Sequence, residues 1–343
     1  MRAAQYSEIG GEVAVTEVAD PICPSDGVVL AVRATGICRS DWHAWRGHDP
    51  VALPHVGGHE YAGTIAEIGV SVRGFAVGDR VTVPFVCGCG ACEYCRAGNA
   101  QVCPDQQQPG FSMPGSFAEY VAVPAAQANL VRLPDDVGFT EAAALGCRFA
   151  TAFRAVAAHG GARPGDWVAV HGCGGVGLSA IMIARALGAR VVAVDVSADA
   201  LARATSLGAE QVVDASRVPD VADAVHTATS GVHLSLDALG SPVTAVNSVR
   251  SLRRRGRHVQ VGLLLGDQST PAIPMDRVLA WELEIHGSHG MAAIDYPAML
   301  AMVRDGRLRP GDLVSRTIGL DGIGAVLAAM DVGSPAGIVV AAP

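Results

Sequence analysis

Residues 167–177 have the sequence WVAVHGCGGVG and decide the fold of the middle of this 343-residue chain. The apolar run predicts a strand, the glycines predict a tight turn, and residues 176–187 predict a helix directly after it. In this context the first glycine permits the turn, the second lets backbone N–H groups approach a pyrophosphate, and the third lets helix and strand pack closely. The segment therefore predicts a strand–turn–helix unit that binds phosphate at the start of its helix.

The acid that ends the next predicted strand completes a candidate dinucleotide site. Asp195 follows the apolar run at 190–194, where a carboxylate would accept hydrogen bonds from an adenosine ribose. Residues 196–198 contain no Arg or Lys, and Asp195 would repel a 2′-phosphate, so we expect NAD rather than NADP. A glycine-rich turn that binds nothing is the alternative. The predicted cofactor-binding residues of the turn are Gly172, Gly174, Gly175, Val176 and Gly177.

Strand and helix signals alternate outward from this unit, from about residue 164 to 288. Further strands are predicted at 211–213, 234–236, 258–261 and 283–285. Such alternation predicts an α/β domain with a doubly wound parallel sheet and helices on both faces. Before residue 150, short runs such as 28–32, 63–69 and 78–83 lie between Gly and Pro residues and predict a mainly β domain. After residue 296 we expect one helix and a final strand at 338–340, packed on the first domain.

Four cysteines in one glycine-punctuated loop predict a structural zinc site. They follow the pattern C-x2-C-x2-C-x7-C, and four thiolates at short spacing suit a tetrahedral Zn²⁺. Disulfides are the alternative, but they would need an oxidising compartment. Cys87 could replace Cys89 as a ligand, although Cys89 gives the regular spacing. The predicted ligands are Cys89, Cys92, Cys95 and Cys103.

A second candidate metal site consists of Cys38, His59 and Cys147, which lie in the segments 35–43, 57–60 and 144–147. Two thiolates and one imidazole leave one position of a tetrahedral zinc open. A catalytic zinc needs this position for water or a substrate oxygen. Each residue taken alone could be an ordinary buried side chain. Together with the four-cysteine loop and the dinucleotide site, they predict a catalytic zinc.

Composition excludes several other classes of protein. Half of the residues are hydrophobic, 17% are charged and 41 are glycine, which is typical of a globular chain. A net charge of -8 argues against a nucleic-acid partner. Residues 1–8 lack an apolar signal core and no later stretch suits a bilayer span, so we expect a cytoplasmic protein without a membrane partner. We interpret the basic cluster of Arg253, Arg254, Arg255 and Arg257 as a solvated helix end.

In the order of these motifs the chain resembles the zinc-dependent alcohol dehydrogenases of the medium-chain dehydrogenase/reductase superfamily. The resemblance rests on GICRSDWH at 36–43, GGHE at 57–60, the four-cysteine loop, GC at 146–147, the glycine-rich turn and Asp195. It implies a GroES-like catalytic domain with both zinc sites at 1–150 and 290–343. It also implies a Rossmann NAD-binding domain at 151–289, two Zn²⁺ per chain, NAD(H), and a homodimer or homotetramer.

The resemblance implies roles for the residues around the catalytic zinc. Cys38, His59 and Cys147 would be its ligands. Glu60 would lie close enough to act as a transient ligand, and Asp41 would orient His59 through the second ring nitrogen.

The resemblance also implies a route for the proton and a contact for the cofactor. Ser40 would accept the proton of the alcohol, and His43 would pass it through the cofactor ribose to solvent. Arg39 would contact the pyrophosphate.

The implied reaction is reversible hydride transfer between a zinc-bound primary or secondary alcohol and the nicotinamide, giving an aldehyde or ketone. Cys147 as the third ligand, in place of a Glu, favours alcohols over polyols or sugars. Trp45 and Phe85 are either core residues or walls of an apolar substrate pocket. Two alternatives stay open, a zinc-dependent polyol or sugar dehydrogenase and a nucleotide-binding relative without catalytic activity.

Overall fold

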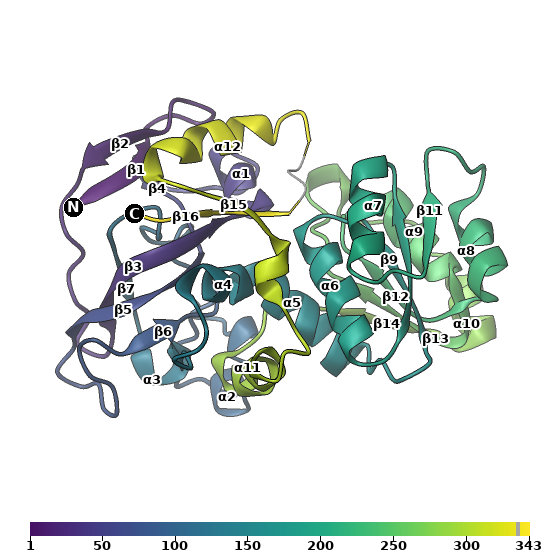
Figure 1. The fold of residues 1–343 in the computed structure, drawn as a ribbon, viewed down its shortest axis with the longest axis horizontal. Helices are drawn as coiled ribbons and strands as arrows, with labels where there is room; N and C mark the ends of the chain where they lie inside the picture. The colour runs from purple at the N-terminus through teal and green to yellow at the C-terminus, as the bar shows by residue number, and fades with distance from the viewer. Residues whose placement is uncertain (334–336) are drawn as a thin grey trace. The chain divides into compact units, whose positions relative to one another are not determined.

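The segment around the glycine-rich turn forms a six-stranded parallel sheet, seen with the rest of the chain in Figure 1. The order reverses at the strand that leads into the turn, which is the doubly wound topology expected from the alternating pattern. In sheet order the strands are β11 (Gln211–Asp214), β10 (Arg190–Asp195), β9 (Trp167–His171), β12 (Val232–Asp237), β13 (Leu252–Gln260) and β14 (Glu284–Gly287).

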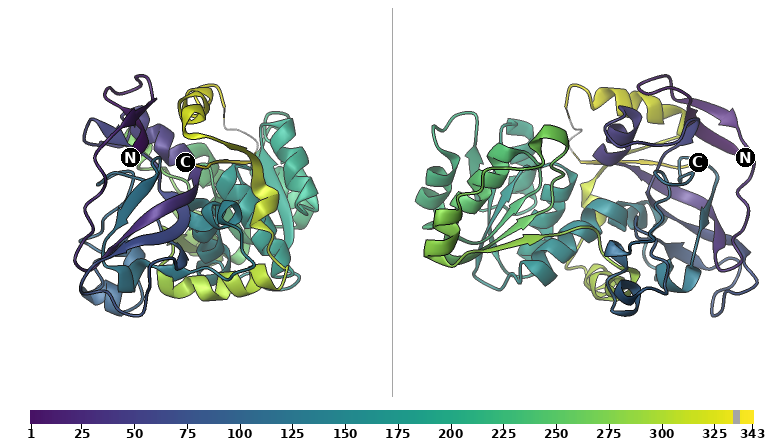
Figure 2. Two further views of the ribbon diagram at one scale, coloured as in Figure 1. Left: turned by 60° about the vertical axis from the view of Figure 1, so that its left-hand side comes forward. Right: turned by 180° about the vertical axis from the view of Figure 1, so that it is seen from behind.

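Helices cover both faces of this sheet (Figures 1 and 2). Trp167 and Ala169 of β9 belong to one buried cluster, which they share with side chains of α8 and α9. Val168 and Val170 alternate with them and are also fully buried. Burial on both sides explains why β9 is apolar from Trp167 to Val170. The helices are α6 (Gly175–Ala186), α7 (Ala198–Ser206), α8 (Val221–Thr229), α9 (Pro242–Arg250) and α10 (Met275–Trp281).

Polar side chains cap three of these helices at their N-termini. The hydroxyl of Ser197 accepts from a backbone N–H of α7, and the carboxylate of Asp220 does the same for α8. Ser241 and Thr244 form a capping box at the start of α9. Such caps satisfy backbone N–H groups that have no partner within the helix. At the start of α6, Gly174 brings no side chain that could do so.

The structure, a computed structural model, describes residues 1–333 and 337–343. They divide into two compact units, Met1–Ala150 with Gly290–Pro343, and Thr151–His289. The parallel sheet belongs to the second unit. Together with the mainly antiparallel β-structure of the first unit, it confirms the predicted α/β fold class.

A long strand, β3 (Val28–Ile37), is the centre of the first unit. It pairs antiparallel with β5 (Glu60–Ile68), β7 (Tyr120–Val123) and β16 (Ile338–Ala341). Because β16 pairs with β3, the expected packing of the tail on the first part of the chain is confirmed. The other strands are β6 (Arg80–Thr82), β8 (Val131–Arg132) and β15 (Val314–Ile318) in the same sheet, and β1 (Arg2–Tyr6), β2 (Ala14–Glu17) and β4 (His55–Val56) in a smaller one.

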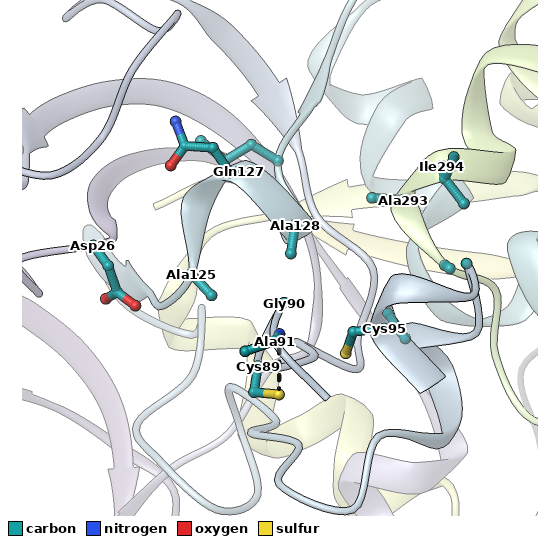
Figure 3. Close-up of a pocket in the computed structure, with 14 residues that line it drawn as sticks. Asp26, Cys89, Gly90, Ala91, Cys95, Ala125, Gln127, Ala128, Ala293 and Ile294 are labelled. Atoms are coloured by element: carbon teal, nitrogen blue, oxygen red, sulfur yellow. Dashed lines mark hydrogen bonds between the residues drawn. The ribbon is translucent and has the colours of Figure 1, made fainter. Parts of the chain in front are cut away.

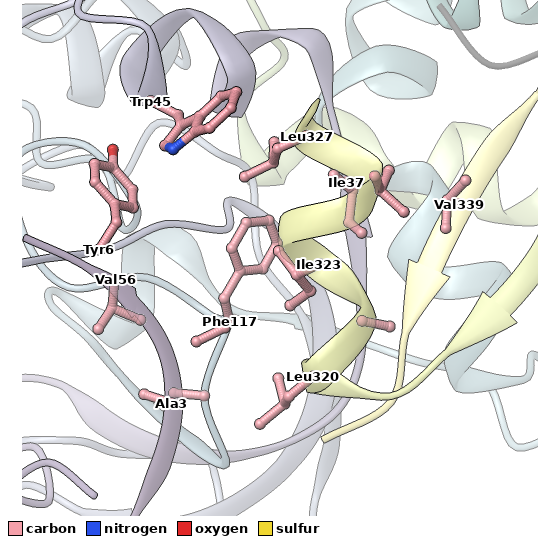
Figure 4. Close-up of a cluster of buried hydrophobic side chains, with 14 of the residues drawn as sticks. Ala3, Tyr6, Ile37, Trp45, Val56, Phe117, Leu320, Ile323, Leu327 and Val339 are labelled. Atoms are coloured by element: carbon pink, nitrogen blue, oxygen red, sulfur yellow. The ribbon is translucent and has the colours of Figure 1, made fainter. Parts of the chain in front are cut away.

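The helices of the first unit are short, and a buried cluster shown in Figure 4 holds two of them against the small sheet. Ile323 and Leu327 of α12 pack there with Trp45 of α1 and Phe117. The helices of this unit are α1 (Arg39–Trp45), α2 (Glu93–Arg96), α3 (Ala126–Asn129), α4 (Phe139–Ala144), α11 (Tyr296–Arg304), α12 (Ile323–Ala329) and the π-helix η2 (Leu145–Phe149). The second unit begins within α5 (Ala150–Phe153) and contains the π-helix η3 (Arg154–His159). Short 3₁₀ segments are η1 (Ala100–Val102), η4 (Gly266–Gln268), η5 (Ala293–Asp295), η6 (Pro310–Leu313) and η7 (Leu320–Gly322).

The expectation of one helix after residue 296 is wrong. The tail contains two helices, α11 and α12, with the strand β15 between them. The strand escapes a search for alternating apolar residues because its three central residues are exposed. With seven residues, α12 is too short for a clear helical period.

The interpretation of the arginine cluster as a helix end is also wrong. The helix α9 ends at Arg250, and the cluster lies on β13, which pairs with β12 and β14. Arg255 and Arg257 form ion pairs with Glu282 and Glu284. Hydrogen bonding to the buried strand β12 and to β14 therefore stabilises this segment as a strand, although its side chains are charged.

Among the helices that the structure describes, none combines the length and the apolar character that a membrane span requires.

Candidate functional site

Cys38, His59 and Cys147 come together in the first unit, with their ligand atoms within 4.8 Å of one another. Cys38 directly follows β3, and His59 directly precedes β5. The two strands pair with Gly36 opposite Glu60, so their ends bring the thiol and the imidazole together. Cys147 reaches the same place from η2, and π-turns of this kind are frequent at functional sites.

The imidazole of His59 has one buried nitrogen that lacks a partner. The residue is fully buried, and Nε2 makes no hydrogen bond with any residue in 1–333 or 337–343. A buried polar atom of this kind is costly unless something binds it. Together with the two neighbouring sulfurs, it fits a Zn²⁺ ion, whose preferred ligands are nitrogen and thiolate sulfur.

The electrostatics favour a thiolate at this position. A hydrogen bond from Cys147 holds the pKa of the Cys38 thiol well below its ordinary value, although burial opposes this, and Arg148 adds to the effect. The thiolate is the form of cysteine that binds metals.

Asp41 ties together the loops that carry Cys38 and His59. Its Oδ1 accepts hydrogen bonds from His59 Nδ1 at 2.9 Å and from the backbone N–H of Gly58 at 3.1 Å. Its Oδ2 accepts from the backbone N–H of Cys38 at 2.8 Å. This contact assigns the proton of the imidazole to Nδ1 and leaves the lone pair of Nε2 for a metal.

The two predicted proton-relay residues lie on α1. Ser40 Oγ is 3.8 Å from Sγ of the candidate ligand Cys38. His43 Nδ1 is 3.0 Å from Nδ1 of His48, an exposed residue that the sequence did not single out. Burial lowers the pKa of His43, and the neighbouring His48 and Arg39 lower it further. His43 is therefore neutral near pH 7 and able to accept a proton.

Arg39, the predicted pyrophosphate contact, makes interactions within the first unit. Its guanidinium donates to the backbone carbonyl of Met330 and lies over the ring of Trp42, 4.4 Å from the centroid. The half-buried side chain is thereby held in a defined position.

Two aromatic rings lie beside His59. The centroids of Phe85 and Phe111 lie 6.0 and 5.1 Å from that of the imidazole, and both residues are half-buried. Trp45, by contrast, is 5% exposed in the cluster of Figure 4, and its indole N–H donates to the carbonyl of Gly11. Trp45 is thus a core residue, while Phe85 and the unpredicted Phe111 give the site an apolar wall.

Glu60, the expected transient ligand, lies beside the third candidate ligand, because its carboxylate accepts a 3.1 Å hydrogen bond from the backbone N–H of Cys147. Among the described residues, its carboxylate is outside the group whose ligand atoms lie within 4.8 Å of one another. It is fully buried and forms an ion pair with Arg148, which the sequence did not mark as a site residue.

The four predicted structural ligands, Cys89, Cys92, Cys95 and Cys103, also converge within 4.8 Å. Backbone N–H groups point at their sulfurs, for example from Cys92 to Cys89 at 3.3 Å and from Cys95 to Cys92 at 3.4 Å. Hydrogen bonds from Ala91 and Cys92 lower the pKa of Cys89 to about 7. Four converging sulfurs with N–H donors around them fit a closed zinc site.

Cys87 belongs to a hydrophobic core. It is 1% exposed and packs among valines and Tyr61, and burial raises its pKa to about 12. The structure thus places Cys89, and not Cys87, with the other three cysteines.

A hollow of about 570 Å³ lies beside the four-cysteine loop (Figure 3). Cys89 and Cys95 line it together with parts of α3 and residues 292–294. Its lining is mostly small and apolar, and it belongs to the loop with the four cysteines. We therefore do not assign it to the substrate.

The glycine-rich turn of the second unit has the geometry that its sequence predicts. Gly172 has a φ of +92°, and a Cβ on Gly177 would lie 1.8 Å from the carbonyl oxygen of Gly172. At Gly174 a Cβ would meet none of the described atoms within 4 Å, so the turn is open there. The helix α6 begins at Gly175, and its free N–H groups fit a phosphate.

Asp195 is placed at the end of β10, close to this turn. Its carboxylate accepts hydrogen bonds from the backbone N–H groups of Cys173 at 2.6 Å and Ser197 at 2.9 Å. A carboxylate has acceptor capacity beyond these two bonds, so a ribose hydroxyl still fits.

Comparison with known proteins agrees with this geometry. The model of the alcohol dehydrogenase GroES-like domain matches residues 24–135, and that of zinc-binding dehydrogenases matches residues 175–305. An alcohol dehydrogenase of Geobacillus stearothermophilus is 33% identical over 343 residues, which cover 99% of this chain and 98% of that protein. The chain belongs to the zinc-type alcohol dehydrogenases of the medium-chain dehydrogenase/reductase superfamily.

Two further relatives show the breadth of this family. A sorbitol dehydrogenase of Halalkalibacterium halodurans is 33% identical over 310 residues, 89% of this chain and 88% of that protein. The solved structure of an alcohol dehydrogenase from Thermus sp. ATN1 is 32% identical, with a TM-score of 0.92 over 100% of this chain and 99% of that one.

Membership in the zinc-type alcohol dehydrogenases confirms the resemblance seen in the sequence and makes this protein an oxidoreductase. It also identifies the first unit as GroES-like and the second as Rossmann-like. Three residues near the predicted site residues were missed, namely Phe111 beside His59, Arg148 beside Glu60 and His48 beside His43. Arg148 directly follows Cys147, but a sequence alone does not show that this arginine is buried.

Proposed function

We propose that this protein is a zinc-dependent, NAD-linked alcohol dehydrogenase. It would transfer hydride reversibly between a primary or secondary alcohol and the nicotinamide, giving an aldehyde or a ketone. The observation that carries the proposal is the unpartnered, buried Nε2 of His59 beside the sulfurs of Cys38 and Cys147.

Cys38, His59 and Cys147 would hold the catalytic zinc, and three protein ligands leave one position for the substrate. When bound, zinc supplies Lewis acidity that lowers the pKa of an alcohol hydroxyl. Cys89, Cys92, Cys95 and Cys103 would hold a second, structural zinc, giving two Zn²⁺ per chain.

Ser40 and His43 would handle the proton. Ser40 is near enough to the ligand Cys38 to accept the hydroxyl proton of a substrate beside it. His43 has a lowered pKa, so its neutral ring can take a proton onward. Asp41 would keep His59 in the tautomer that leaves Nε2 free.

The second unit would bind NAD. The turn formed by Gly172, Gly174, Gly175, Val176 and Gly177 would receive the pyrophosphate at the N-terminus of α6. Asp195 would bind the adenosine ribose and disfavour NADP. Arg39 would contact the pyrophosphate, as the family resemblance implies.

A polyol or sugar dehydrogenase is the second candidate, favoured by the similarity to a sorbitol dehydrogenase. Phe85 and Phe111 argue for a less polar substrate, because an apolar wall offers no hydrogen bonds to the additional hydroxyl groups of a polyol. The proposed assembly is a homodimer or homotetramer, which analytical ultracentrifugation would decide.

Initial rates of NAD⁺ and NADP⁺ reduction with primary, secondary, aryl and polyol substrates test the proposal. We expect turnover of simple alcohols with NAD⁺ and its loss after removal of zinc by a chelator. Preference for polyols would favour the second candidate. Bound zinc and NADH without turnover of any substrate would favour a relative without catalytic activity.

A matched pair of cysteine variants tests the metal assignment. Cys38→Ser should lose about one zinc per chain and nearly all activity while it keeps its circular dichroism spectrum. Cys23→Ser alters a half-buried cysteine outside both metal groups, and this variant should keep its zinc content and its activity. Full activity in Cys38→Ser would disprove the assignment.

A further inference from the structure

The carboxylate of Glu60 is bound by donors from one short segment. Its Oε1 accepts from the backbone N–H groups of Cys147 at 3.1 Å and Arg148 at 2.8 Å. The Nε of Arg148 lies 3.1 Å from Oε1 and 3.0 Å from Oε2, and a terminal nitrogen of the guanidinium also contacts Oε2. Both carboxylate oxygens therefore accept hydrogen bonds, Oε1 from backbone N–H groups and the guanidinium, and Oε2 from the guanidinium alone.

Neighbouring residues leave space for the ion pair of Glu60 and Arg148 and hold the segment that carries Arg148. A Cβ on Gly36 would lie 2.6 Å from Glu60 Oε2 and 3.2 Å from a terminal nitrogen of Arg148, so the pair rests on the bare backbone of β3. Tyr296 donates a 3.0 Å hydrogen bond to the carbonyl of Gly146, which fixes η2 from the side of α11. The side chain of Arg148 is only 8% exposed and that of Glu60 is fully buried.

Glu60 directly follows the candidate ligand His59 and is an oxygen ligand that zinc would accept. With Glu60 as a fourth ligand, the site would become closed, like a structural zinc site, and would hold no substrate. The contacts with Arg148 and with the backbone beside Cys147 oppose that movement.

We propose that Arg148 is a positioning residue of the catalytic zinc site, which holds Glu60 out of the metal coordination and so keeps the fourth position open for the alcohol. Through the N–H groups of Cys147 and Arg148, the same carboxylate anchors the segment that carries the third ligand. The inference rests on the proposed function.

The experiment compares Arg148→Gln with the double variant Glu60→Gln/Arg148→Gln after replacement of zinc by Co²⁺. The visible d–d absorption of Co²⁺ reports its coordination without any substrate. All variants share the four-cysteine site, so spectral differences between them report the site of Cys38, His59 and Cys147. Arg154→Gln is the matched control, because Arg154 lies on η3 and contacts His159.

In Arg148→Gln the freed carboxylate should enter the coordination, change the d–d spectrum and raise the KM for the alcohol about 10- to 100-fold. The double variant has no carboxylate and should return both quantities toward the wild-type values. An unchanged spectrum in Arg148→Gln would overturn the proposal. The proposal would also be overturned if the spectrum and the KM of the double variant were no closer to the wild-type values than those of Arg148→Gln. Arg148 would then act only on the fold.

If Arg148→Gln does not fold, Arg148→Lys takes its place. A lysine keeps the charge but cannot engage both oxygens with a planar fork, so a smaller spectral change in the same direction is expected. No change in that variant would overturn the proposal. If the wild-type protein oxidises no alcohol, the proposed function fails, while the cobalt spectra still decide the role of Arg148.

Discussion

The carboxylate of Asp195 accepts a 2.6 Å hydrogen bond from the backbone N–H of Cys173, which ties the end of β10 to the glycine-rich turn. The sequence predicts one task for this acid, the recognition of a ribose. The contact adds a second task, because it helps to fix the turn that would receive the pyrophosphate.

Asp195→Ala should change both cofactor preference and affinity. Loss of the negative charge removes the repulsion of a 2′-phosphate, so the ratio of kcat/KM for NAD⁺ to that for NADP⁺ should fall by about tenfold or more. Loss of the contact with Cys173 should also raise the Kd for NAD⁺. Steady-state kinetics with both cofactors and fluorescence titration with NADH measure the two effects.

Asp214→Ala is the control for this prediction. Asp214 lies opposite Asp195 on the neighbouring strand and accepts a hydrogen bond from the N–H of Ser216 at 3.0 Å, a local geometry like that of Asp195 with Ser197. It should leave cofactor preference unchanged. If Asp195→Ala also leaves the preference unchanged, another residue discriminates against NADP⁺.

The four-cysteine loop gives a second prediction, which tests whether Cys89 or Cys87 is the zinc ligand. Cys89→Ala should lose about one zinc per chain and unfold at a lower temperature, because a structural zinc contributes directly to folding. Cys87→Ala should keep its zinc and lose only roughly 1 kcal/mol of stability through poorer packing. Metal analysis and thermal unfolding of both variants test this. Loss of zinc from Cys87→Ala alone would make Cys87 the ligand.

The sequence predicted those features whose signals are local. The turn at Gly172 has its glycines at fixed spacing between an apolar strand and a helix, and the alternation of strands and helices predicts the parallel sheet. The four cysteines are likewise close together in the chain. In the tail, β15 was missed because an exposed edge strand carries little apolar pattern.

The residues that escaped prediction near the site depend on contacts between distant segments. Arg148 is buried against Glu60, which lies 88 residues away in the sequence and reaches η2 only in the folded chain. Phe111 reaches His59 from a loop without a motif. In the sequence alone, Arg148 and Phe111 cannot be distinguished from surface charged residues or ordinary core aromatic residues.

The pair of His43 and His48 gives a third prediction, about pH dependence. Burial, His48 and Arg39 lower the pKa of His43 from its ordinary 6.5, so its ring stays neutral and able to accept a proton below that pH. His48→Ala removes one of these causes and should raise the pKa of His43. The acid limb of the kcat profile for alcohol oxidation should then move to higher pH.

Rates between pH 5 and 9 for the wild type, His48→Ala and His43→Ala test this prediction. His43→Ala should lower kcat about 10- to 100-fold, and added imidazole should restore part of the loss. An acid limb at the same pH in the wild type and His48→Ala would show that another group controls it.

The buried histidine of β9 gives the last prediction, about stability in acid. His171 is 1% exposed, and burial lowers its pKa from 6.5 to about 3, with the nearby His258 adding to the effect. Between these two pH values the unfolded chain binds a proton that the folded chain does not. The contribution of His171 to the free energy of unfolding is therefore fully present above pH 6.5. It is lost as the pH drops toward 3, at about 1.4 kcal/mol per pH unit.

His171→Leu should remove this dependence without leaving a polar group unpaired, because Ser251, the neighbour of His171, also donates to the carbonyl of Asn247 at 2.7 Å. Between pH 7 and 5, the wild type should lose about 2 kcal/mol more unfolding free energy than the variant. Urea unfolding at the two pH values measures this. Both proteins still contain His258, whose contribution cancels in the comparison. Equal losses would mean that His171 takes up a proton in the folded protein as readily as in the unfolded chain.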